Sequence, residues 1–173
     1  TKLVDPPLAQ IEIGFSREVP PEAEAYLARY AVAGVLAPFF EQGEISAVNA
    51  WEIAQERDIE VQHGQVRSTR GHVNLVAITV TTPTGRSHLK GTTDGMRLLE
   101  VNDFVIDLRP AGNMLLTIHK DQPGVVAHLA TAFADRNINI SEMHLARTDA
   151  GGTAMMLVGV DCPLEEDVLE AVS

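Results

Sequence analysis

The sequence predicts an α+β protein built in two parts. Its 173 residues, of which 45 % are hydrophobic, are enough for one medium domain or two small ones. Residues 1–109 mix helical periodicity with strands, whereas residues 110–173 follow a strand–helix–strand–strand–helix order. The segment RPAG at 109–112 is short and irregular, and it separates the two patterns. We therefore expect one domain over 1–109 and a second over 110–173.

The first part opens with a strand and two helices. Between residues 11 and 15 every second side chain is large and apolar, which is typical of a half-buried strand. A helical period runs from the proline pair at 20–21 to Pro38, and proline is favoured at the first position of a helix. A shorter helix is expected over 50–58, with Asn49 as its N-cap in a capping box with Glu52.

Strands dominate the rest of the first part, from residue 59 to 108. The run NLVAITVTT at 74–82 is rich in β-branched residues, and a Pro-Thr-Gly turn leads to a returning strand at 87–93. The segments LLEV and FVIDL flank Asn102 and Asp103, which predicts a two-residue hairpin turn. We expect an α+β unit whose strands are mostly joined by hairpins.

The second part has the element order of a ferredoxin-like unit. Strands are expected at 114–118, 139–146 and 153–160, a helix opens at Pro123-Gly124, and a second helix covers 164–172. A complete ferredoxin-like unit has the order βαββαβ and ends with a fourth strand. The sequence stops at Ser173, so we expect this unit to lack its last strand, either because the chain is a fragment or because it has a further tail.

Composition excludes several classes of protein. With 24 acidic against 13 basic residues, the net charge of −11 argues against a nucleic-acid or anionic-membrane surface, because phosphate binding needs clustered Lys and Arg. No apolar run reaches the roughly 18–20 residues of a membrane span, and the first ten residues do not form a signal peptide. Cys162 is alone, which fits a reducing compartment. We expect a soluble cytoplasmic protein.

The familiar catalytic motifs are missing from the sequence. It contains no G-x-G-x-x-G or G-x-x-x-x-G-K-[ST] loop, no H-E-x-x-H or C-x-x-C motif, and no G-x-S-x-G elbow. Its six histidines are scattered without metal-ligand spacing. We assign no catalytic residue, metal site or cofactor to this chain.

An acid-free stretch in the first part is the first positive feature. Residues 61–93 contain no Asp or Glu, although the chain as a whole is strongly acidic. Such a stretch favours a local positive patch for a small phosphate or carboxylate, because arginine offers paired donors to a planar anion. The alternative is a strand surface on which Arg and Thr have replaced Glu. The candidate anion-binding residues are Arg67, Arg70, Arg86 and Lys90.

The second feature is the segment HKDQPG, which runs from His119 to Gly124 at a strand-to-helix turn. Asp121 could cap the helix, or its carboxylate could receive a ligand ammonium while amides at the helix start receive a ligand carboxylate. Asn139 begins the next strand and offers an amide donor and acceptor. The second alternative suits a free α-amino acid.

Several motifs resemble a known family when they are taken in order. IHKDQPGVV, NINISEMHLAR and GGTAMMLVGVD are similar to an ACT domain, in particular to the ACT domain that ends D-3-phosphoglycerate dehydrogenases. VNAWEIAQERDIEV, NLVAITV, KGT and LLEVNDFVIDLRPAGNMLL resemble the intervening domain of the long form of that enzyme, also called its allosteric substrate-binding domain. The resemblance covers residues 8–173.

The resemblance implies a regulatory function. ACT domains of this family bind L-serine as a feedback inhibitor between two subunits, through the residues at His119, Asp121 and Asn139. The resemblance further implies a homodimer or larger assembly formed through the ACT domain, and an anion or substrate bound by basic residues of the intervening domain. The parent would be the NAD-dependent first enzyme of serine biosynthesis, and its NAD site and catalytic residues would belong to upstream domains.

Two alternatives stay open at this point. The β chain of an iron–sulfur L-serine dehydratase joins a related domain to a similar ACT domain, although its serine-rich, histidine-containing N-terminal signature is missing here. A freestanding amino-acid-binding module would have no catalytic partner, but an unpaired sheet edge is a poor end for a natural chain.

Overall fold

The computed structural model describes residues 8–41, 43–66 and 72–172. The chain forms two compact units that divide between Asn102 and Asp103, and each unit is described here by itself. The last strand of the first sheet, β6 (Phe104–Leu108), is grouped by its contacts with the C-terminal unit. Both units mix helices with sheets, so the predicted α+β class is confirmed.

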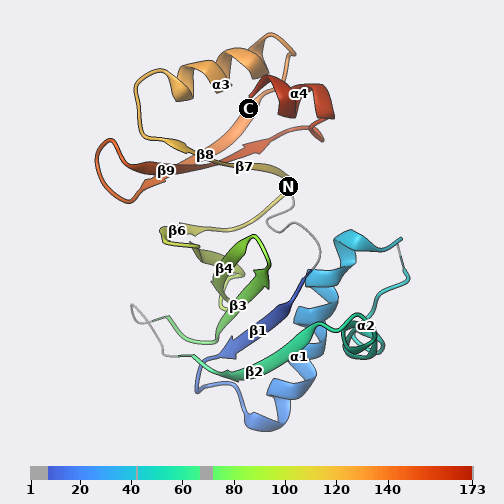
Figure 1. Cartoon of the computed structure of the whole chain (residues 1–173). Helices are drawn as coiled ribbons and strands as arrows, with labels where there is room; N and C mark the ends of the chain where they lie inside the picture. The colour runs from blue at the N-terminus through green and yellow to red at the C-terminus, as the bar shows by residue number, and fades with distance from the viewer. Residues whose placement is uncertain (1–7, 42, 67–71, 173) are drawn as a thin grey trace. The chain divides into compact units, whose positions relative to one another are not determined.

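The larger sheet has the strand order β2-β1-β3-β4-β5-β6, and all of its strands except β6 belong to the N-terminal unit (Figure 1). The first two strands are parallel, and the chain passes between them through two helices and one 3-10 turn. Strand β3 pairs antiparallel with β1, and the consecutive pairs β3–β4 and β4–β5 are also antiparallel, as hairpin connections require. The bounds are β1 (Gln10–Phe15), α1 (Pro21–Leu36), η1 (Ala37–Phe39), α2 (Ala50–Glu56), β2 (Glu60–Gln65), β3 (Leu75–Thr82), β4 (Gly85–Thr92) and β5 (Arg97–Val101).

Strand β1 has the alternating burial that the sequence predicts. Ile11, Ile13 and Phe15 are buried and belong to the same core cluster as Val32 and Leu36 of α1. Residues between them, such as Glu12, point to the opposite face of the sheet, because successive side chains of a strand alternate. The sheet thus has an apolar face toward α1 and a polar face that carries charged groups.

The predicted capping box at α2 is wrong. Asn49 precedes the helix, but its side chain makes no capping hydrogen bond. Its Oδ1 accepts a hydrogen bond from the backbone N–H of Ser46 at 2.8 Å, and its Nδ2 donates to the carbonyl of Glu44 at 2.8 Å. The preceding turn therefore uses the side-chain groups that a capping box would need.

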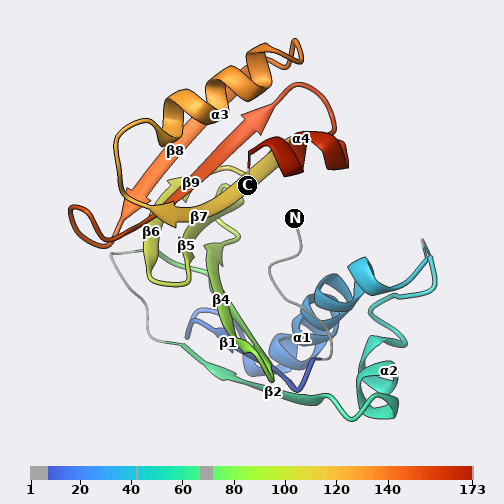
Figure 2. The same ribbon diagram turned by 45° about the horizontal axis from the view of Figure 1, so that its top comes forward.

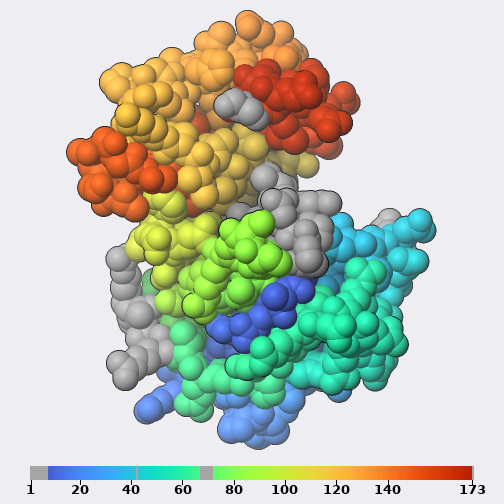
Figure 3. Space-filling view, in the orientation of Figure 1, coloured from blue at the N-terminus to red at the C-terminus, as the bar shows by residue number. Residues whose placement is uncertain are grey.

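The C-terminal unit confirms the predicted ferredoxin-like layout. Its three-stranded sheet has the order β7-β9-β8, and both neighbouring pairs are antiparallel. Both helices pack on one face of this sheet (Figure 2), and the space-filling view shows their side chains next to one another (Figure 3). The bounds are β7 (Asn113–Lys120), α3 (Val125–Ala134), β8 (Ile140–Arg147), β9 (Thr153–Val160) and α4 (Glu166–Ala171).

Strands β7 and β8 are the edges of this sheet. Within the part of the chain that the structure describes, no strand pairs with the outer side of either one. The expected fourth strand of the ferredoxin-like unit is therefore not among the described elements. Among the described residues, no helix is long and apolar enough to cross a membrane.

Candidate functional site

One end of the C-terminal sheet collects the groups that the sequence singled out. Strand β7 ends at Lys120, and a short loop leads to α3, whose N-cap is Gly124 with φ +97°. A Cβ atom on Gly124 would meet nothing within 4 Å, so its backbone angle, and not a close neighbour, calls for glycine. No side chain caps α3, and the alternative of Asp121 as its cap is wrong.

The Asp121 carboxylate instead holds two loops together. Its Oδ2 accepts hydrogen bonds from the backbone N–H of Gly151 at 3.0 Å and from Arg147 Nη1 at 3.2 Å. The Asp121 N–H donates to the carbonyl of Gly152 at 2.9 Å. The Gly151 N–H, followed by Arg147, lowers the pKa of Asp121, so the carboxylate is ionised near neutral pH. The loop before α3 is thereby fixed to the β8–β9 hairpin.

The His119 ring has one hydrogen-bonded nitrogen and one that lacks a partner. Its Nδ1 lies 3.0 Å from the carbonyl oxygen of Lys120. Its Nε2 is buried and, among the described residues, has no hydrogen-bond partner, and the same holds for Thr117 Oγ1. A buried polar atom without a partner is costly, and the described residues leave this cost uncompensated at both atoms.

A cavity of about 440 Å³ lies along β7, between this edge strand and the two helices. Its lining is mostly apolar, and its polar members are Thr117, His119 and His128. His128 Nε2 lies 3.1 Å from the carbonyl oxygen of Ala171, so this histidine links α3 to α4. The cavity follows the outer edge of β7, where the expected fourth strand would pair.

Asn139 lies at the opposite end of the sheet. His119 is paired with Ala154 of β9, whereas Ile140, the residue after Asn139, is paired with Val160. Six residues of β9 separate these two positions, which is about 20 Å at ~3.3 Å per residue. Asn139 Nδ2 donates to Asp161 Oδ2 at 2.9 Å. One chain therefore brings His119 and Asp121 together, but it does not bring Asn139 to them.

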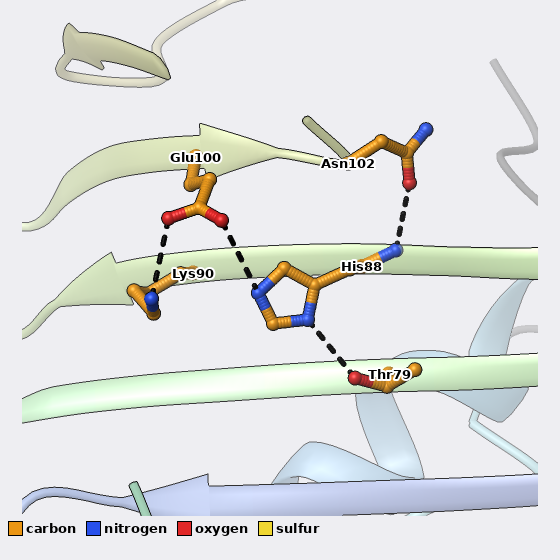
Figure 4. Close-up of polar contacts among 5 residues, drawn as sticks. All are labelled: Thr79, His88, Lys90, Glu100 and Asn102. Carbon is orange, nitrogen blue, oxygen red and sulfur yellow. Dashed lines mark hydrogen bonds and ion pairs between the residues drawn. The ribbon is translucent and has the colours of Figure 1, made fainter. Parts of the chain in front are cut away.

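A second polar cluster stands on the polar face of the N-terminal sheet (Figure 4). His88 Nδ1 is 2.9 Å from Thr79 Oγ1, and its Nε2 is 3.9 Å from Glu100 Oε1. Glu100 Oε2 accepts a hydrogen bond from Lys90 Nζ at 3.2 Å. Asn102 Oδ1 accepts from the His88 backbone N–H at 2.8 Å. Strand register brings these groups together, since Lys90 is paired directly with Glu100 and Thr79 with His88.

The predicted anion patch is described only in part. Arg67 and Arg70 lie outside the described residues. Arg86 forms an ion pair with Glu12 at 2.7 Å, and Lys90 forms the pair with Glu100. Both carboxylates come from strands outside the acid-free stretch, so each described cation of the candidate set has an acidic partner. A cavity of about 310 Å³ lies beside this cluster, and its lining includes Glu12, His63, Thr79 and His88.

Sequence reasoning missed Arg147 as a member of the site. The expected strand, 139–146, ends one residue before Arg147, and nothing local marks Arg147 as the partner of a residue 26 positions earlier. The strand pairing is what reveals it, because Arg147 of β8 and His119 of β7 are both paired with Ala154 of β9. Among the described residues, no group of three or more potential metal ligands is present.

Comparison with known protein families agrees with this geometry. Residues 113–173 match the model described as the ACT domain, so the C-terminal unit is an ACT domain. Residues 1–102 match the model described as the D-3-phosphoglycerate dehydrogenase intervening domain. Since this match covers more than half of the sequence, the chain belongs to the D-3-phosphoglycerate dehydrogenase intervening-domain family. The resemblance seen in the sequence is confirmed.

Curated relatives extend along almost the whole chain. D-3-phosphoglycerate dehydrogenase from Archaeoglobus fulgidus is 28 % identical over 170 residues, which cover 96 % of this chain and 32 % of the relative. The Bacillus subtilis enzyme of the same name is 26 % identical with the same coverage. A probable L-serine dehydratase β chain from Bacillus subtilis is 30 % identical over 129 residues, covering 72 % of this chain and 58 % of the relative. The chain spans about a third of the length of both dehydrogenases.

Proposed function

We propose that this chain is a regulatory part of an NAD-dependent D-3-phosphoglycerate dehydrogenase and that its ACT domain binds L-serine as an allosteric effector. The family matches support the regulatory part, and relatives over nearly the full chain carry the name of that dehydrogenase. We assign the NAD chemistry to the rest of the parent protein, because this sequence has no dinucleotide-binding loop. The cytoplasm stays our expected location.

The observation that carries the serine proposal is the separation of the site residues. His119, Asp121 and the uncapped start of α3 lie at one end of the sheet, and Asn139 lies at the other. An amide about 20 Å away cannot reach the same small ligand. A site that uses all of these groups therefore needs a second copy of the chain.

The outer edge of β8 offers a way to build such a site. If two β8 strands pair antiparallel across a two-fold axis, Ile140 of one copy lies beside Arg147 of the other. Asn139 of one copy then approaches the end of the other sheet that holds His119 and Asp121. Serine bound between the copies would favour the paired arrangement, and this preference is the coupling free energy that an allosteric effector needs.

Mixing two variants tests the shared site. In a calorimetric titration with L-serine, we expect His119→Ala and Asn139→Ala each to bind far more weakly than the wild type. A dimer of one His119→Ala chain and one Asn139→Ala chain keeps one of its two sites intact. After random exchange half of the dimers are mixed in this way, so roughly a quarter of all sites should bind normally. D-serine and glycine are the ligand controls.

Three outcomes contradict the proposal. If neither variant weakens serine binding, or if the wild type binds no serine, the site is not where we place it. If the mixture shows no recovery although subunit exchange is demonstrated, the two groups do not act across two copies. A serine response would also appear in a thermal shift, because ligand at a hundredfold excess over its Kd stabilises the folded state by about 2.7 kcal/mol.

A second candidate is part of an L-serine dehydratase, which the relative of that name favours. L-serine is a ligand under both candidates, so serine binding alone does not distinguish them. The parent protein should reduce NAD with 3-phosphoglycerate under the first proposal. It should release ammonia from L-serine under the second.

We also propose that the N-terminal unit binds a small anion, with Arg67, Arg70, Arg86 and Lys90 as candidate residues. The support is the line of Arg86, His88 and Lys90 at alternate positions of β4, which puts them on one face of the sheet. Because Glu12 and Glu100 pair with Arg86 and Lys90, an anion has to compete with these carboxylates. Titration with phosphate tests this proposal, and we expect Arg86→Met with Lys90→Met to weaken binding.

A further inference from the structure

Three residues lie in a row across one end of the C-terminal sheet. His119 of β7 and Arg147 of β8 are both paired with Ala154 of β9, the strand between them. Directly paired residues of antiparallel strands point to the same face, so all three side chains lie on the side that α3 and α4 cover. Ala154 is small and fully buried, and it separates a histidine from a guanidinium.

Asp121 completes this end of the sheet with a fixed negative charge. Its side chain is 22 % exposed, and its Oδ2 is held by the Gly151 N–H and by Arg147 Nη1. Arg147 is in turn oriented by this contact, although its side chain is 57 % exposed. A carboxylate and a guanidinium thus stand next to each other in fixed positions at the surface.

The Arg147 guanidinium has N–H donors that the contact with Asp121 does not use. Arginine has five N–H donors in a planar fork, and the contact with Asp121 uses Nη1. Among the described residues, Asp121 is the one side chain that accepts a hydrogen bond from Arg147. The remaining donors match a second planar carboxylate, which arginine binds through two parallel hydrogen bonds.

From this geometry we infer that Arg147 binds the α-carboxylate of the amino-acid ligand while Asp121 receives its ammonium group, an inference that rests on the proposed serine site. A zwitterion carries its two charges on adjacent groups, and the pair of Asp121 and Arg147 presents the complementary charges side by side. The uncapped start of α3 adds N–H groups that favour the same carboxylate. Arg147 would therefore set the selectivity for free amino acids over their uncharged derivatives.

The experiment compares two ligands on three proteins. L-serine and L-serinamide differ at one group, a charged carboxylate in the first and a neutral amide in the second, provided that both amines are protonated at about pH 6. Their affinities are measured by calorimetry on the wild type, on Arg147→Met and on Arg136→Met. Arg136 is the matched control, because it belongs to the same unit and is also ion-paired with a carboxylate, that of Asp167, but it follows the far end of α3.

We expect the wild type and Arg136→Met to prefer serine by roughly tenfold or more, since the charge-assisted hydrogen bonds that the carboxylate accepts from Arg147 are stronger than those a neutral amide accepts. In Arg147→Met this preference should fall by about tenfold, leaving only the part that the N–H groups at the start of α3 supply. The ratio of affinities is the readout, because loosening of the loops lowers both affinities but leaves their ratio unchanged. If Arg147→Met does not fold, Arg147→Lys keeps the charge without the planar fork and should reduce the preference.

Failure of this inference and failure of the serine site give different results. If the wild type prefers serine and the variants at Arg147 keep the full preference, the inference is overturned and the serine site stands. If the wild type binds neither ligand, the serine site itself is rejected, and the inference falls with it. If the wild type binds both ligands equally, the carboxylate is not recognised and Arg147 has no such role.

Discussion

The two units hold their charged side chains in different ways. In the N-terminal unit, Lys90 and Glu100 face each other from paired strands. In the C-terminal unit, Asp121 stands in one loop and contacts Arg147 at the end of β8 and Gly151 in another loop. Strand pairing fixes the first contact wherever the sheet forms. The second also depends on how the loop before α3 meets the loop between β8 and β9.

The largest expected effect tests whether the units are separate cooperative bodies. Phe15 of β1 and Phe133 of α3 are fully buried, one in each core. Replacing either with alanine should destabilise its own unit by about 3–5 kcal/mol, through lost burial and an added cavity. Hydrogen exchange of β1 and β9 amides measures the two units in the same sample.

We expect Phe133→Ala to raise exchange in β9 while β1 keeps its protection, and Phe15→Ala to do the reverse. Equal loss of protection in both strands with either variant would mean that the chain unfolds as one body. The comparison between the units would then have no thermodynamic basis.

Alanine substitutions at two glycines test the comparison with smaller expected changes in stability. Gly124 has φ +97°, so alanine there should cost about 1–2 kcal/mol through backbone strain. Gly34 lies exposed within α1, and a Cβ there meets nothing within 4 Å. Gly34→Ala should therefore stabilise the N-terminal unit by about 0.5–1 kcal/mol. Urea unfolding measures both changes in the free energy of unfolding. If both variants were stabilised, or both destabilised, the two glycines would not differ in backbone conformation as described.

The smallest expected effect is on the stability of the C-terminal unit at acid pH. The pKa of Asp121 is lowered in the folded state by the Gly151 N–H and by Arg147. Its contribution to stability is therefore complete above its ordinary pKa of 3.8, and it is lost as the pH falls through the lower folded-state value. Asp121→Asn should destabilise the C-terminal unit at about pH 6 and make little difference at about pH 2.

Asp161→Asn is the control for this titration, because it removes one exposed carboxylate from the same unit without touching the loop contact. If the difference between the wild type and Asp121→Asn stays constant over the acid range, the ionised form of Asp121 does not stabilise the loops. Chemical denaturation at each pH gives the free energies to be compared.

The fold could be predicted from the sequence to the extent that local patterns determine it. The alternation from Ile11 to Phe15 gave β1 its correct face, and Thr153–Val160 was predicted with the bounds that the structure shows. The capping box at Asn49 failed because a nearby turn competes for the same side chain. The residue pattern of a capping box does not show which of the two sets of hydrogen bonds the Asn49 side chain will make.

The site was predictable in its residue types but not in its geometry. The strand-to-helix turn and Gly124 mark the end where His119 and Asp121 lie. Arg147 could not be found in this way, because its link to Asp121 crosses the middle strand of the sheet and depends on two registers. The position of Asn139 at the far end likewise follows from strand pairing, which a single sequence does not specify.

The placement of His119 and Asn139 at opposite ends of one sheet has a consequence for the response to an effector. If the binding site is shared as we propose, each chain carries two half-sites and no whole one. Mass action then makes the apparent affinity depend on how much protein is present, as well as on the effector. Dilution would weaken the response, and a rise in protein level would sharpen it, so a protein of this design would report its own abundance together with that of its ligand.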